Sequence, residues 1–74
     1  MNKVTREVRE VAKQYGYERL TCIMRMDITR YSAMIGKTGV KILVDIQTAR
    51  VWRWSPFKRR LILEQRKVDT KVNK

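Results

Sequence analysis

The chain has 74 residues, and its 18 Lys and Arg against seven Asp and Glu give a formal net charge of +11. This length supports one domain with a small core, and self-association stays open as a way to bury more apolar surface in a homodimer. Such a charge indicates an anionic partner, because it otherwise destabilises the compact state by self-repulsion.

The residues that are absent exclude several classes of protein. A single cysteine excludes an internal disulfide, and the lack of histidine excludes His-dependent general-base, metal and triad chemistry. The longest apolar run, Ile42 to Val44, is too short to span a membrane. The N-terminus alternates charged and apolar residues and has no signal-peptide pattern. We therefore expect a soluble, cytoplasmic protein.

The first segment predicts a helix. Its apolar residues recur every three or four positions and form one stripe, Val4, Val8, Val11 and Tyr15. Gly16 fits the position just after a helix end. We expect this stripe to cover a sheet.

After Gly16 the apolar period changes to two, which predicts a strand with one buried face. The residues expected on that face are Leu20, Cys22, Met24, Met26 and Ile28. This placement makes Cys22 an inert, buried thiol. Residues 29–35 are expected to extend this strand into a hairpin that closes at residues 36–39, and a short helix over residues 29–35 is the open alternative.

The second half predicts further strands. Val40, Ile42, Val44 and Ile46 alternate on one side of a strand, Gln47 to Ala49 is expected to reverse the chain, and a third strand follows over residues 50–54. Pro56 ends that strand, and residues 60–65 predict a fourth strand in preference to a helical turn. The fold class is thus α+β: residues 1–66 form one domain, with the N-terminal helix packed on an antiparallel sheet of three to four strands, and residues 67–74 form a mobile basic tail.

The segment from Arg50 to Arg60, RVWRWSPFKRR, combines both tryptophans and the only phenylalanine with basic residues and no acid. Aromatic rings stack on bases, and guanidinium and ammonium groups pair with phosphates. In a strand, Arg50, Trp52 and Trp54 would share one face, opposite to Arg53. The open alternatives are that the indoles fill the core and that the charges are merely solvated. The candidate nucleic-acid-binding residues are Arg50, Trp52, Arg53, Trp54, Phe57, Lys58, Arg59 and Arg60, together with Lys37.

Lys37 belongs to a Gly-Lys-Thr-Gly sequence over residues 36–39 that resembles part of a phosphate-binding loop. The full motif needs a glycine where this chain has Tyr31, and it needs a following helix where this chain predicts a strand. Nucleotide hydrolysis is therefore not predicted. Lys37 and the amides of the turn are kept as a phosphate contact.

The leading hypothesis is a small nucleic-acid-binding protein for DNA or RNA, with phosphate contacts, base stacking and low sequence specificity. It is not expected to be an enzyme, and no catalytic residue, metal or cofactor is predicted. The alternative is a protein-interaction or inhibitor module that docks on an acidic surface of a larger protein, for example one that processes nucleic acid, with the tryptophans as anchors. A distant third is a nuclease holding Mg²⁺ through Asp27, Asp45 and Glu64 near Lys41, although both aspartates are expected to point to solvent.

Overall fold

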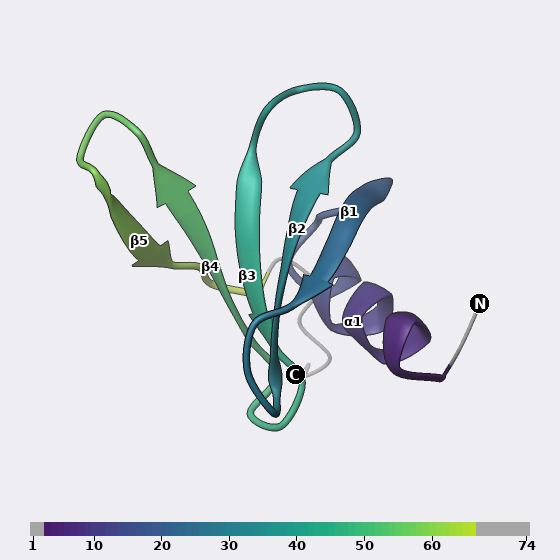
Figure 1. Cartoon of the computed structure of the whole chain (residues 1–74). Helices are drawn as coiled ribbons and strands as arrows, with labels where there is room; N and C mark the ends of the chain where they lie inside the picture. The colour runs from purple at the N-terminus through teal and green to yellow at the C-terminus, as the bar shows by residue number, and fades with distance from the viewer. Residues whose placement is uncertain (1–2, 67–74) are drawn as a thin grey trace, which may run out of the picture.

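The computed structural model describes residues 3–66, which form one helix and a five-stranded antiparallel sheet (Figure 1). The elements are α1 (Lys3–Lys13), β1 (Leu20–Arg25), β2 (Arg30–Ile35), β3 (Lys41–Asp45), β4 (Arg50–Ser55) and β5 (Arg60–Leu63). The strands lie in chain order, so each connection between them is a hairpin. The α+β class is confirmed, and the predicted three to four strands were too few. The tail predicted to be mobile, residues 67–74, lies outside the described residues.

The additional strand arises because the chain turns between Arg25 and Arg30 where a continuous strand was expected. The backbone amides of Met26 and Asp27 both donate to the carbonyl of Arg30, and the Asp27 carboxylate accepts from the amide of Ile28 at 2.7 Å. This turn contains no glycine or proline, which are the usual turn signals. Residues 30–35 are extended, as predicted, but they form the separate strand β2 and do not continue the first strand; the helical alternative was wrong.

A β-bulge in β1 overturns the predicted buried face of that strand. The register against β2 shifts between Thr21 and Met24, and Cys22 has a φ of 52°. An extra residue in one strand reverses the alternation of the side chains beyond it. Cys22 and every later residue of the predicted buried face are exposed, and Ile23 packs against the core instead.

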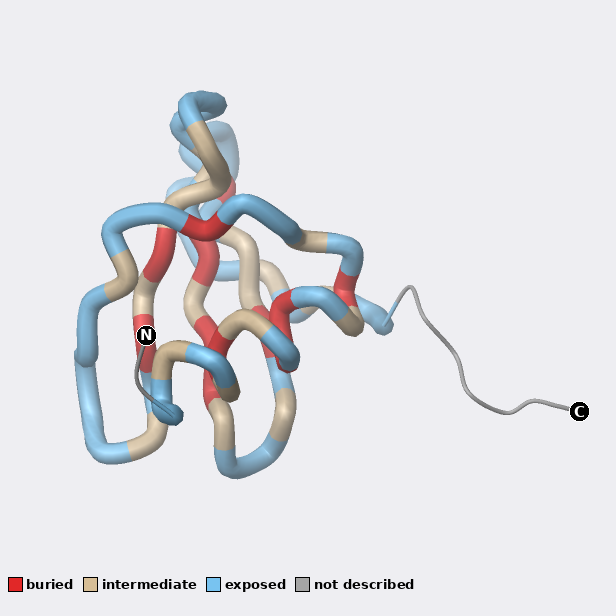
Figure 2. The backbone as a smooth tube through the Cα atoms, turned by 90° about the vertical axis from the view of Figure 1, so that its right-hand side faces the viewer, coloured by how far each residue is buried: buried red, intermediate tan, exposed pale blue. Residues whose placement is uncertain are grey.

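The core lies between α1 and the middle of the sheet, where the buried segments gather in Figure 2. The helix contributes Val8, Val11 and Ala12, followed by Tyr15, and the sheet contributes Leu20, Tyr31, Ala33, Ile42, Val44 and Val51. The predicted stripe is thus correct except for Val4, which is 37% exposed. Gly16 follows the helix with a φ of 86°, as expected for the residue after a helix end. No helix within residues 3–66 is long and apolar enough to cross a membrane.

The β3–β4 and β4–β5 turns share one form. Each spans four residues, 46–49 and 56–59, and each ends on a left-handed residue, Ala49 with φ 57° and Arg59 with φ 56°. In each turn the last side chain of the preceding strand accepts backbone hydrogen bonds. The Asp45 carboxylate accepts from residues 47 and 48 at 2.9 and 3.2 Å, and the Ser55 hydroxyl accepts from residue 58 at 3.1 Å. The chain reversal predicted at residues 47–49 is therefore confirmed.

Candidate nucleic-acid interface

The sheet has one face covered by α1 and one face on which no other described element packs. Because side chains alternate along a strand, the neighbours of the core residues Tyr31, Val44 and Val51 point away from the helix. We call this second surface the open face. Its residues are Met24, Arg30, Ser32, Met34, Lys41, Leu43, Asp45, Arg50, Trp52, Trp54, Leu61 and Leu63.

Both tryptophans lie on the open face. Trp52 is half-buried between its cross-strand neighbours Leu43 and Leu63, and Trp54 lies opposite Leu61 and is 38% exposed. The indoles therefore do not fill the core beneath α1. Arg50 shares their face, as the strand alternation predicted.

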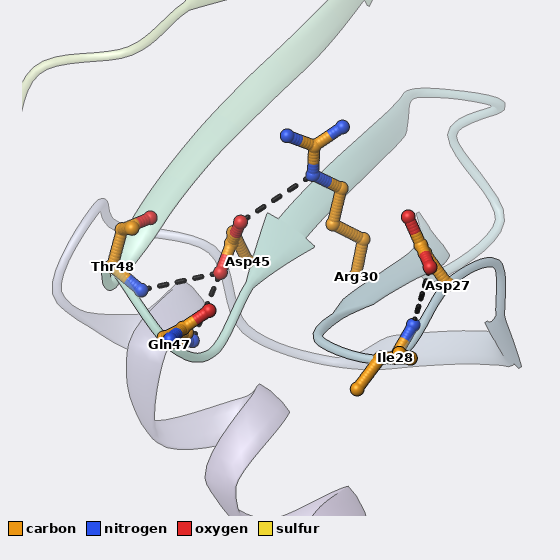
Figure 3. Close-up of polar contacts among 6 residues, drawn as sticks. All are labelled: Asp27, Ile28, Arg30, Asp45, Gln47 and Thr48. Atoms are coloured by element: carbon orange, nitrogen blue, oxygen red, sulfur yellow. Dashed lines mark hydrogen bonds and ion pairs between the residues drawn. The ribbon is translucent and has the colours of Figure 1, made fainter.

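A fixed cation lies above Trp52. The Arg30 guanidinium is 5.9 Å from the centre of the Trp52 ring, and its Nε lies 3.4 Å from the Asp45 carboxylate (Figure 3). Burial raises the pKa of Asp45. Hydrogen bonds from the amides of Thr48 and Gln47 and the contact with Arg30 lower it, and together they outweigh burial, so the pKa of Asp45 is below its usual value. The expectation that Asp45 points to solvent was wrong, because this carboxylate organises the β3–β4 turn and holds Arg30.

Arg53 lies on the helix side of the sheet, away from the indoles. Its Nε is 3.5 Å from the Glu64 carboxylate, and the same carboxylate oxygen accepts a hydrogen bond from the Tyr17 hydroxyl. Burial, the hydrogen bond to Glu64 and the charge of Glu64 raise the pKa of Tyr17 to about 12, against a smaller opposing effect of Arg53. Arg53 thus joins β4 to the segment after β5 through its ion pair with Glu64.

The remaining candidate residues lie in two turns at one end of the sheet, where β4 and β5 swing away from β3 (Figure 1). The β4–β5 turn presents Phe57, which is 95% exposed, with Lys58, Arg59 and Arg60, all exposed. Lys37 is exposed in the β2–β3 turn. A shallow hollow between the two turns is lined by Thr38, Gly39, Val40, Lys41, Arg53, Trp54 and Pro56. The basic turns therefore lie beside the more exposed of the two indoles.

The Gly-Lys-Thr-Gly segment closes the β2–β3 hairpin. The Thr38 hydroxyl donates to the carbonyl of Ile35 at 2.7 Å and accepts from the amide of Val40 at 3.2 Å. A strand follows it, β3, as the sequence predicted. This geometry leaves the backbone amides without the helix N-terminus that a phosphate-binding loop requires.

The three acids considered for a nuclease are separated in the fold. Asp27 is exposed in the β1–β2 turn, Asp45 is buried beside Arg30, and Glu64 is bound to Arg53 and Tyr17. Within residues 3–66, no three His, Cys, Asp or Glu side chains gather where they could hold a metal ion.

Sequence reasoning missed the residues that other strands add to the open face. Arg30, Lys41, Leu43, Leu61 and Leu63 were not selected, because their place beside the tryptophans depends on the register of four strands. The signal that could have found Arg30, Lys41 and Leu43 is the alternation itself, since each follows or precedes a core position, whereas Leu61 and Leu63 flank Ile62, which is not part of the core. Comparison of the chain with models of protein families, with curated proteins and with solved structures found no match.

Proposed function

We propose that this protein binds nucleic acid, DNA or RNA, through the open face and the adjoining β4–β5 turn. The observation that carries the proposal is the position of Trp52 and Trp54 on the sheet face opposite α1, among basic side chains of β2, β3 and β4. Aromatic platforms bordered by cations are typical of proteins that hold nucleic acid with little sequence preference. The role proposed is binding without catalysis, in the cytoplasm, with no metal or cofactor.

The phosphate contacts come from cations that no acid neutralises. Within residues 3–66, the ion pairs join Arg30 to Asp45 and Arg53 to Glu64, and Arg50, Lys58 and Arg59 have no such partner. Release of counterions from phosphates favours binding by free cations and makes the affinity fall with salt. We therefore assign the main phosphate contacts to Arg50, Lys41, Lys37 and the cations of residues 58–60, and we assign Arg53 to the fold.

The proposal is tested by titrating a labelled oligonucleotide, in single-stranded and duplex form, over a range of salt concentrations. Binding should weaken steeply between about 50 and 200 mM salt. Arg50→Ala should weaken binding and reduce the slope of log affinity against log salt by about 1, as expected for the loss of one phosphate contact. Arg6→Ala is the matched control, because Arg6 is an exposed arginine on α1. Undetectable binding of both forms at low salt would falsify the proposal.

A protein partner is the second candidate, and the exposed apolar side chains of the open face favour it. Leu61 is 44% exposed, Leu63 is 53% exposed and Met24 is 61% exposed, which adds apolar surface beyond the two indoles. Contiguous apolar surface is a mark of protein interfaces, where Trp and Arg are frequent anchors. Co-purification of one host protein that survives nuclease treatment and is lost in Leu61→Ser would support this candidate.

A further inference from the structure

We propose that the ligand of the open face is a single-stranded segment whose bases lie along β4. This inference rests on the nucleic-acid binding proposed above and adds the strandedness and the path of the ligand. It is carried by the arrangement of the open face in rows that run across the strands, by the spacing of the indoles, and by the charges at each end.

The open face is layered along the strand direction. The first row is charged and consists of Arg30, Asp45 and Arg50. The middle row crosses all five strands and consists of Met24, Ser32, Leu43, Trp52 and Leu63. The third row brings Met34 beside Lys41 and Trp54 beside Leu61. A ligand that follows β4 thus passes from a cationic end over two aromatic rows to the basic β4–β5 turn.

The spacing of the indoles along this path suits separated bases. Trp52 and Trp54 are two residues apart on one strand, so their attachment points are about 6.8 Å apart. Neighbouring bases in a duplex rise by only about 3.4 Å. Bases that lie on both indole rows are therefore drawn apart to about twice the duplex spacing, which an unpaired strand can adopt.

The two indoles offer different surfaces to such bases. Within residues 3–66 no cation stacks on Trp54, and Trp54 is the more exposed of the two tryptophans, so we assign it the first stacked base. The Arg30 guanidinium already lies over Trp52, and the Asp45 carboxylate holds it there. The next base or its phosphate contacts the Arg30 guanidinium above Trp52, since a guanidinium plane both stacks on rings and binds phosphate.

A duplex fits this surface less well than a single strand. The outer surface of a duplex is its charged backbone, while the base faces are covered by their neighbours, so Leu43 and Leu61 would gain no apolar contact. A second copy of this chain also fits less well, because it would bring Arg30, Lys41 and Arg50 of two molecules together at one interface. Charge complementarity and apolar contact are both satisfied by an unpaired nucleic-acid strand.

The test compares an oligothymidylate of about twelve nucleotides with a duplex of the same length, at one salt concentration. The single strand should bind at least about tenfold more tightly, and it should quench the tryptophan emission of the unmodified protein. Equal or tighter binding of the duplex would overturn this inference and leave the proposed function standing. Failure of both ligands to bind would overturn both.

Substitution of the exposed indole adds an independent readout. Trp54→Leu keeps an apolar side chain on the sheet and should weaken single-strand binding about 5- to 100-fold while duplex binding changes little. Arg6→Ala should bind like the unmodified protein. Single-strand affinity unchanged in Trp54→Leu, or a dimer in sedimentation that the oligonucleotide cannot dissociate, would overturn the inference. If Trp54→Leu does not fold, the test of stacking rests on whether the single strand quenches the tryptophan emission of the unmodified protein.

Discussion

At the scale of single residues, Asp45 links the fold to the open face. Its carboxylate accepts the amides that close the β3–β4 turn and also holds Arg30, which lies over Trp52 (Figure 3). A buried carboxylate with these partners is stabilising only while it is ionised, since the hydrogen bonds and Arg30 both favour the charged form. The position of the Arg30 guanidinium above Trp52 therefore depends on the Asp45 carboxylate.

We expect Asp45→Ala to lower the free energy of unfolding at pH 7 by about 2–3 kcal/mol, because it removes a charged acceptor from several donors. Asp45→Asn keeps an acceptor oxygen and should cost about half as much. The folded-state pKa is lowered, so the stabilisation is present above about pH 4 and is lost as pH falls through the folded pKa. Urea unfolding at a series of pH values should show that the difference in the free energy of unfolding between the native protein and Asp45→Asn becomes smaller in acid. A constant difference would contradict this account of Asp45.

For Tyr17 we expect the opposite pH dependence, a loss of stability as the pH rises. Its folded pKa of about 12 lies above the ordinary value of about 10, so the folded state binds the proton more tightly. The stability from the hydrogen bond to Glu64 is thus fully present below about pH 10 and is lost as pH rises through about 12. Tyr17→Phe should be less stable by about 1 kcal/mol at pH 7 and should converge on the native protein at high pH. Tyrosinate absorbance that titrates near pH 10 for all three tyrosines would contradict the assignment.

At the scale of elements, the two matching turns hold the open face in place at opposite ends of β4. Each ends on a left-handed residue that is not glycine, which carries a cost in backbone free energy. Arg59 is exposed and belongs to the interface that we propose, whereas the carbonyl of Ala49 accepts a hydrogen bond from the Tyr15 hydroxyl at 2.6 Å. Ala49 is partly buried and packs against the core, so glycine at this position would relieve the strain but lose the contacts of one methyl group.

We expect Ala49→Gly to raise the free energy of unfolding by about 0.5–1 kcal/mol, because glycine adopts this φ without a steric penalty. The measurement is chemical denaturation, in which the slope of the free energy of unfolding against denaturant concentration should stay unchanged. Gln47→Gly is the control in the same turn, since residue 47 has no left-handed φ and glycine there should give no gain. Equal effects of both substitutions would mean that the turn conformation differs from the one described.

Some elements of the fold can be predicted from local sequence patterns, and others depend on pairing between strands. The helix stripe and the alternation of β3 and β4 follow from local period, because their side chains pack directly on one another. The presence of β1 also follows from its period of two, but its buried face beyond Leu20 and its end at Arg25 do not, since the bulge at Cys22 depends on pairing with β2 and the Asp27 turn lacks a glycine or proline signal. Trp52 and Trp54 could be placed on one face from sequence, but that this face lies opposite α1 required the register of the whole sheet.

At the scale of the whole molecule, the charge of +11 and the uncovered sheet face point to the same kind of partner. Residues 50–74 hold nine basic and two acidic residues, and among the described ones Arg50 lies on the face of the tryptophans while Lys58, Arg59 and Arg60 follow β4 in and after the β4–β5 turn. Reversing Lys58, Arg59 and Arg60 to Glu should abolish oligonucleotide binding at moderate salt, with little effect on stability because these side chains are exposed. Thermal unfolding of the triple variant provides the control for folding.

The most direct test of the proposed nucleic-acid surface is amide and indole chemical-shift mapping with an unpaired oligonucleotide. We expect the indole signals of Trp52 and Trp54 and the amides of β4 and the β4–β5 turn to shift together. The exposed residues of α1, including Arg6, should not move, because the helix covers the opposite face of the sheet. Shifts confined to α1, or to the turns with both indole signals unchanged, would contradict the assignment of the open face as the nucleic-acid surface.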